Sequence, residues 1–193
     1  MKARSKPRGF TLIELLVGLA VIALLLMFGV PSFTTFLRNS EIRSTAESLV
    51  NGLRAASTEA ANRNTRVAFT LAGSGDASWT INVVKDPATK ELEQPPIQAY
   101  SRKEAGANTK VTLTPAGKLQ VMFTGLGRVE NQGMPDDHLQ QIDVESVVSG
   151  EARPLRIIID DPNPADPAKP RGLRLCDPDP ALAALSPPDP RAC

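Results

Sequence analysis

Few residues of this chain have the types and spacing that catalysis or metal binding requires. The sequence contains one histidine, His138, and two cysteines, Cys176 and Cys193. A single histidine excludes most histidine-based catalytic sets and most metal sites. We also find no nucleophile with a base to activate it, so an anchored enzyme is not supported. The sequence therefore predicts no catalytic residue, no metal site and no cofactor.

The acidic residue whose position most needs a chemical explanation is Glu14. It is the fifth residue of the apolar run Phe10 to Val30, and a lone charge inside a membrane costs roughly 2.5 to 3.5 kcal/mol on insertion scales. No arginine or lysine occurs between Arg8 and Arg38, so the same helix offers no partner. The counter-charge must come from another chain or from a newly exposed amino terminus.

A long uncharged segment carries Glu14. No charged residue occurs from Leu15 to Leu37, and the run Phe10 to Val30 would rise ~31 Å as a helix, which matches a bilayer core of ~30 Å. Four basic residues lie before Gly9 and should remain cytoplasmic. We therefore expect a transmembrane helix over residues 10–35, with the rest of the chain on the far side. The alternative is an ordinary cleaved secretory signal, which would have a shorter apolar stretch.

A second helical pattern follows the first. Pro31 should kink the helix without ending it, because the pattern resumes beyond it. Apolar residues then recur at alternating spacings of four and three, opposite a charged face. These apolar residues are Ile42, Ala46, Leu49, Leu53, Ala56 and Ala60. We expect an amphipathic continuation over residues 36–64 that packs on a sheet, with a detached coiled coil as the alternative.

From residue 65 to residue 176 the apolar period changes to two, which is typical of strands. Val67, Phe69 and Leu71 alternate with small or polar residues, and a second alternating run follows the turn at residues 73–76. Further strands are predicted at residues 97–101, 111–114, 119–123, 140–146, 155–159 and 172–176. The predicted fold class is α+β: a long N-terminal helix packed on a domain of antiparallel β-sheets.

Residues 8–15, Arg-Gly-Phe-Thr-Leu-Ile-Glu-Leu, resemble the prepilin motif of the type IV pilin class. The resemblance makes residues 1–9 a basic leader that prepilin peptidase removes by cutting after Gly9. It also implies N-methylation of the new amino terminus, Phe10. The freed ammonium would then supply the counter-charge for Glu14 of a neighbouring subunit, so that Glu14 would set the axial register of assembly.

The order of elements resembles the GspH/FimT branch of minor pilins and pseudopilins, in which a sandwich of antiparallel sheets follows the helix. The Pro-rich segment 177–193 is similar to the cysteine-bracketed tail of FimT-type proteins. Both cysteines lie at this end, on the side of the membrane where disulfides persist, and their separation is too wide for a Cys-x-x-Cys redox pair. A structural disulfide between Cys176 and Cys193 is favoured.

The resemblance implies a structural subunit of the FimT/FimU kind, which initiates a type IV pilus or lies near its tip. The implied partners are prepilin peptidase, other minor and major pilins, and the inner-membrane assembly platform. The chain would cross the inner membrane once, with its N-terminus cytoplasmic and its C-terminal domain periplasmic, before it enters the filament. A GspH-like pseudopilin of a type II secretion system is the alternative, because it shares the leader, helix and sandwich.

A DNA-binding minor pilin of natural transformation is a further alternative. Some FimT-type proteins have a Gly-Arg-x-Arg motif near the tail, but residues 172–175 here read Gly-Leu-Arg-Leu. In an extended strand Leu173 and Leu175 share a face, and we expect them to be buried. Removing the leader would leave 18 basic and 21 acidic side chains, which disfavours DNA. A small basic cluster of Lys169, Arg171 and Arg174 is the one place where we expect a DNA contact.

Overall fold

The computed structural model describes residues 9–86, 88–101, 108–130, 138–148, 152–159, 173–185, 189 and 191–193. The side chains of residues 28, 29, 31, 32 and 183 are outside this description. Contacts divide the chain into an N-terminal unit, Met1–Leu37, and a C-terminal unit, Arg38–Cys193.

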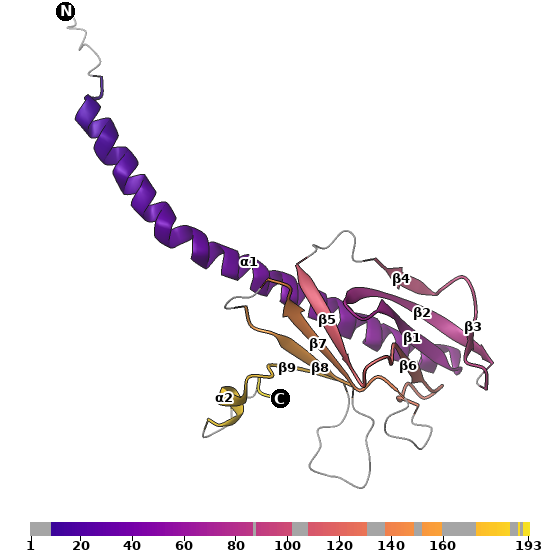
Figure 1. Cartoon of the computed structure of the whole chain (residues 1–193). Helices are drawn as coiled ribbons and strands as arrows, with labels where there is room; N and C mark the ends of the chain where they lie inside the picture. Colours follow the sequence, from indigo (N-terminus) through magenta and orange to yellow (C-terminus); the bar gives the residue numbers. More distant parts are fainter. Residues whose placement is uncertain are drawn as a thin grey trace, which may run out of the picture. The chain divides into compact units, whose positions relative to one another are not determined.

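One helix, α1 (Leu12–Arg63), contributes to both units (Figure 1). It continues through Pro31, so the prediction that this proline does not end the helix is confirmed. In the N-terminal unit the large apolar side chains that the structure describes are exposed. Among the described residues, none of the helices combines the length and the hydropathy that a membrane crossing requires.

The C-terminal half of α1 is amphipathic, as its pattern predicts. The six residues of the apolar stripe are at most 1% exposed: Ile42, Ala46, Leu49, Leu53, Ala56 and Ala60. The helix ends at Arg63, and Asn64 follows with a left-handed φ of 48°. Asparagine adopts this conformation more readily than most residues, which explains the stop at the predicted place.

The first sheet contains β1 (Val67–Gly73), β2 (Asp76–Asp86), β3 (Glu91–Leu92), β4 (Gln98–Tyr100) and β6 (Gln120–Phe123). Its order is β3-β2-β1-β6, with β4 also pairing with β2, and every pair is antiparallel. The predicted hairpin is confirmed, since Val67 pairs with Val83 and Leu71 pairs with Trp79. Strand β3 was not predicted, because two residues show no period.

The second sheet contains β5 (Thr109–Thr114), β7 (Gln141–Ser146), β8 (Leu155–Ile158) and β9 (Arg174–Cys176), in the order β5-β7-β8-β9. All its pairs are antiparallel. These four strands overlap the ranges predicted from the period of two. A short helix, α2 (Pro180–Ala183), follows the sheet.

One hydrophobic core joins the C-terminal half of α1 to both sheets. The sheets lie along that half of the helix (Figure 1), and their inward residues form one buried cluster with the helix stripe. Gly52 lets the helix approach closely, because a Cβ there would lie 2.8 Å from atoms of both Phe69 and Trp79. The Phe69 and Trp79 rings are themselves 5.6 Å apart. The predicted α+β fold is confirmed.

Candidate processing and assembly site

The predicted cleavage position precedes the first turn of α1. Gly9 and Phe10 are exposed and lie outside the helix, which begins at Leu12. A Cβ at Gly9 would meet no atom within 4 Å, and Phe10 is 85% exposed. The peptide bond between these two residues therefore lies outside the helix.

Thr11 and Glu14 form a reciprocal cap at the start of α1. The backbone N–H of Thr11 donates to Glu14 Oε2 at 3.4 Å, and the backbone N–H of Glu14 donates to Thr11 Oγ1 at 3.3 Å. This is the capping box that a Thr-x-x-Glu sequence favours. This role of Thr11 was not predicted, although the spacing of the two residues was sufficient to predict it.

The capping geometry leaves Glu14 able to change partners. Its side chain is exposed, and its hydrogen bond of 3.4 Å is near the long limit for a bond of this kind. An ammonium group would bind the carboxylate more strongly than a neutral amide does.

The large apolar side chains on both sides of Glu14 have no cover in the described structure. Those of the N-terminal unit that lie in α1 are between 46% and 79% exposed, from Leu37 to Leu12. They occur on all sides of the helix, and a Cβ at Gly18 would meet open space. A helix that is apolar all round must be covered by lipid or by other helices. This segment is therefore a surface for contacts outside the chain.

The predicted disulfide joins Cys176 at the end of β9 to Cys193, with a Cα–Cα distance of 5.1 Å. Backbone hydrogen bonds support it: the N–H of Asp177 donates to the Arg191 carbonyl at 2.7 Å, and the N–H of Cys193 donates to the Asp177 carbonyl at 3.0 Å. The tail is thus fixed to the sheet both covalently and by backbone pairing.

An ion pair orders the last turn of the tail. Arg191 Nη2 lies 2.7 Å from Asp189 Oδ2, and the Arg191 backbone N–H also donates to Asp189. The Arg191 side chain, followed by its backbone N–H, lowers the pKa of Asp189 to about 2. Asp179 similarly caps α2 by accepting a hydrogen bond from the N–H of Ala181.

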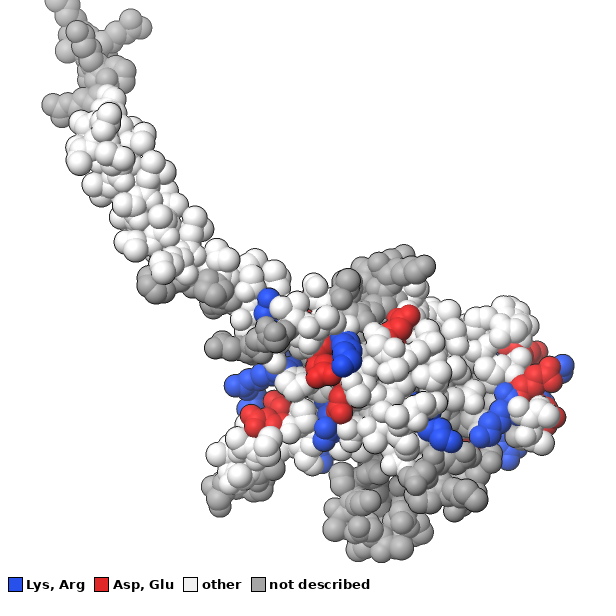
Figure 2. All heavy atoms as spheres, in the orientation of Figure 1, with Lys and Arg blue, Asp and Glu red and all other residues white. Residues whose placement is uncertain are grey.

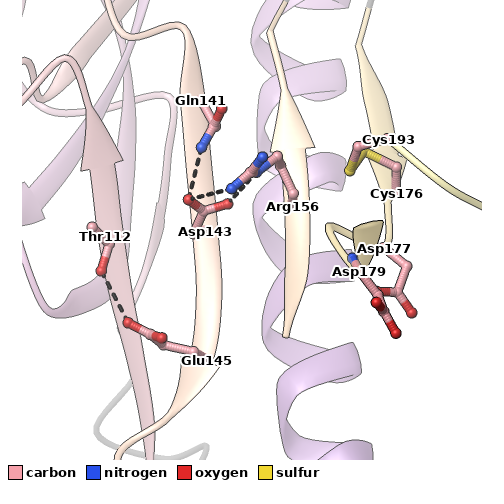
Figure 3. A network of polar contacts seen from close by, with 9 residues as sticks. All are labelled: Thr112, Gln141, Asp143, Glu145, Arg156, Cys176, Asp177, Asp179 and Cys193. Atoms are coloured by element: carbon pink, nitrogen blue, oxygen red, sulfur yellow. Dashed lines mark hydrogen bonds and ion pairs between the residues drawn. A yellow bond between two sulfur atoms is a disulfide. The ribbon is translucent and has the colours of Figure 1, made fainter. Parts of the chain in front are cut away.

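The outer face of the second sheet carries a row of paired polar side chains (Figure 3). Arg156 Nε lies 2.7 Å from Asp143 Oδ1, and Gln141 Nε2 donates to Asp143 Oδ2 at 2.7 Å. Thr112 donates to Glu145 at 3.2 Å. Within the described ranges no three His, Cys, Asp or Glu side chains gather as a metal site would require. The row links strands and does not resemble a reactive site.

The basic cluster proposed for DNA is only partly visible. Lys169 and Arg171 lie outside the described residues, and the guanidinium of Arg174 donates a hydrogen bond to the Ala192 carbonyl. Basic and acidic side chains are interspersed over the face shown in Figure 2. In the described structure Arg174 therefore contacts the tail, and the DNA contact stays a prediction.

The predicted burial of Leu175 is wrong. Leu173 is half-buried and packs on the core, but Leu175 is 37% exposed. Leu175 pairs with the fully buried Ile157, so the two side chains share the core-facing side of the sheet. Because β9 is the last strand of its sheet, Leu175 lies at the margin of the core and is only partly covered.

The helix, the two antiparallel sheets and the exposed processing segment define a type IV pilin-like protein. Residues 4–30 match the prokaryotic N-terminal methylation motif, and residues 45–162 match the type II transport protein GspH. The second match covers more than half of the chain, which therefore belongs to the GspH family of minor pseudopilins. Searches of curated proteins and of solved structures give no match.

Family membership confirms several predictions made from the sequence. GspH pseudopilins are structural and non-enzymatic, so no catalytic role is expected of this chain. The methylation motif implies processing by prepilin peptidase, and the pseudopilin class implies assembly with other pilins. Proteins with this motif are typically anchored in the inner membrane by their N-terminal hydrophobic segment. The FimT/FimU assignment is not confirmed, and the match supports the type II secretion alternative better.

Proposed function

We propose that this chain is a minor pseudopilin of a type II secretion system, a structural subunit of the short filament that such a system assembles. The observation that carries the proposal is the GspH match over residues 45–162. That range includes the buried half of α1 from Thr45 onward and the strands from β1 to β8. The match therefore rests on the folded domain and not on the leader, which many filament subunits share.

Before assembly, in this proposal, residues 10–35 anchor the chain in the inner membrane and the C-terminal unit lies in the periplasm. The basic residues before Gly9 and the absence of charge from Leu15 to Leu37 support this orientation. The disulfide between Cys176 and Cys193 is consistent with an oxidising compartment. The inner-membrane assembly platform would extract the anchored subunit into the filament.

During assembly, cleavage after Gly9 frees the amine of Phe10, and Glu14 of one subunit pairs with the terminal ammonium of another. Support comes from the exposure of both residues and from the weak contact of Glu14 to its own helix. The apolar segment meanwhile exchanges lipid for neighbouring helices. The Phe10 amine and the Glu14 carboxylate lie close together in the sequence. A pair between these groups on two subunits would therefore fix the axial offset between the two helices.

Comparing two variants at the start of α1 tests this role. Glu14→Ala removes the carboxylate, whereas the control Thr11→Ala removes the hydroxyl that accepts from the Glu14 N–H and keeps the carboxylate. We expect both to be cleaved normally. Glu14→Ala should be lost from sheared or cross-linked assemblies, and Thr11→Ala should be retained. Equal loss of the two variants would show that Glu14 acts only as a cap, and normal entry of Glu14→Ala would remove the register role.

A deletion strain separates the secretion function from a pilus function. We expect loss of the chain to abolish type II secretion and to leave pilus number unchanged, with the wild-type sequence restoring secretion. A minor pilin of a type IV pilus is the second candidate, because the disulfide-closed tail is similar to that of FimT-type proteins. Loss of pili with normal secretion would favour that candidate over the proposal.

A further inference from the structure

The end of the tail lies against the edge of the second sheet. Among the described strands β9 is the last of that sheet, and Asp177, which follows β9, forms a parallel bridge with Ala192. The Asp177 N–H donates to the Arg191 carbonyl, and the Asp177 carbonyl accepts from the Cys193 N–H. Ala192 is 6% exposed, and its carbonyl accepts from the Arg174 guanidinium. The tail therefore continues the sheet by one bridge and covers part of an edge to which another strand could otherwise pair.

Among the described residues, few contacts other than the disulfide hold the tail in this place. No described residue of the segment 177–193 belongs to the hydrophobic core cluster. The ion pair of Arg191 with Asp189 and the hydrogen bond that caps α2 lie within the tail itself. The hydrogen bonds at the end of β9 each add little net free energy in water. The disulfide between Cys176 and Cys193 therefore determines how firmly the tail covers the edge.

The two cysteines of this disulfide (Figure 3) differ in their exposure. Cys176 is 3% exposed, whereas Cys193 is an exposed residue. A thiolate that opens a disulfide attacks one sulfur and expels the other, and access helps to decide which sulfur is attacked. The packing around Cys176 shields it from an attacking group. Attack at Cys193 is therefore favoured.

We propose that this disulfide is a redox clasp that a dithiol reductant opens at Cys193. One thiolate of the reductant attacks Cys193 Sγ, the S–S bond breaks, and Cys176 Sγ leaves as a thiolate that takes up a proton. The second thiol of the reductant, as its thiolate, then attacks the mixed disulfide and releases Cys193, which takes up a proton. The reductant is thereby oxidised to a disulfide, and the two cysteines gain two electrons and two protons. In an oxidising compartment the clasp stays closed.

Opening the clasp frees the end of the tail from the sheet edge. The N–H and carbonyl of Asp177, which the closed tail occupies, then become accessible to solvent or to another strand. The clasp lies wholly within the C-terminal unit, so it is independent of the proposed function.

Trapping of mixed disulfides on the folded full chain locates the attacked sulfur. The chain in detergent is treated with reduced glutathione, quenched with acid, alkylated and mapped by mass spectrometry. We expect at least about tenfold more glutathione on Cys193 than on Cys176, because exposed cysteines react and buried ones are inert. In urea, where burial is lost, the two cysteines should react to similar extents. No adduct, or equal adducts on the two cysteines of the folded chain, would overturn the inference.

Hydrogen exchange measures whether reduction opens the tail. After reduction the amides of Asp177 and Cys193 should exchange about tenfold faster, because local opening exposes them. The amides of β7, which pairs with a strand on each side, should stay protected and show that the domain is folded. The double variant Cys176→Ser, Cys193→Ser should show the fast exchange without reductant. Unchanged exchange at Asp177 and Cys193, with the disulfide reduced and β7 protected, would reject the clasp.

Discussion

The apolar side chains of the two halves of α1 differ in their exposure. In residues 12–37 the described large apolar side chains are 46% to 79% exposed, whereas the stripe from Ile42 to Ala60 is at most 1% exposed. Both halves are equally helical. The difference lies in the pattern around the axis, because the first half has no polar face and the second has one. Half of the helix finds its packing partner within the chain, and the other half needs one outside it.

This contrast separates stability from assembly within a single helix. The second half joins the core with both sheets, so its side chains contribute to the folding free energy. The first half contributes a cap, a carboxylate and an exposed apolar surface, and in the proposed function the carboxylate and the apolar surface serve contacts with membrane or neighbours. Matched substitutions in the two halves should therefore have different consequences.

The largest difference should appear between Leu53→Ala and Leu19→Ala. Leu53 is 1% exposed and Leu19 is 56% exposed. Truncating the buried leucine should lower the free energy of unfolding by about 2 to 5 kcal/mol, and truncating the exposed one by less than about 0.5 kcal/mol. Fluorescence of Trp79, the single tryptophan, reports the denaturant unfolding of the C-terminal unit. Equal losses from the two variants would contradict the division of roles.

Replacing both Cys176 and Cys193 by serine should have the next largest effect. In the chain-entropy model, a disulfide spanning this separation stabilises by about 3 kcal/mol. The hydrogen bonds of Asp177 to Arg191 and Cys193 would remain, so the tail should loosen and not rearrange. The test compares thermal unfolding of the double variant with that of the wild type, with and without reductant. If reductant still lowers the unfolding temperature of the double variant, the Cys176–Cys193 disulfide is not the source of the stabilisation.

Gly52→Ala and Gly18→Ala give a finer comparison of the two halves. A methyl group at Gly52 would collide with Phe69 and Trp79, whereas one at Gly18 would meet no atom within 4 Å. We expect Gly52→Ala to destabilise by about 1 to 3 kcal/mol through overpacking. Gly18→Ala should leave the unfolding of the C-terminal unit unchanged. The fluorescence emission of Trp79 should shift in Gly52→Ala and not in Gly18→Ala. If Gly52→Ala is as stable as the wild type, the packing of residue 52 against Phe69 and Trp79 is loose.

The smallest expected effect is a change in how the stability of the tail depends on pH. Arg191 lowers the pKa of Asp189 from 3.8 to about 2, so this pair stabilises the fold above about pH 4 and stops doing so as the pH falls through about 2. Asp189→Asn should therefore flatten the dependence of tail stability on pH between these values. Hydrogen exchange of the Asp177 and Cys193 amides measures the effect. An unchanged pH profile in the variant would show that the ion pair does not stabilise the tail.

Regular apolar patterns in the sequence predict those helices and strands that bury one face against other parts of the same chain. The stripe of α1 and the alternation in β1 mark buried faces directly, so helix and hairpin were predictable. The Thr11–Glu14 cap was readable from its spacing and was missed. In contrast, the exposure of Leu175 depends on β9 being an edge strand, and the close contact at Gly52 depends on aromatic residues from two strands. Such features require the tertiary arrangement, which local periodicity does not contain.

The intact mass and N-terminal sequence of the chain recovered from cell membranes and assemblies show whether the first half of α1 is processed. We expect a polypeptide that lacks residues 1–9 and begins at Phe10 with one added methyl group, in both fractions. Material that begins at Met1 in the assemblies, or an unmodified chain that never associates with membranes, would contradict the claim that the first half of α1 is processed for contacts outside the chain.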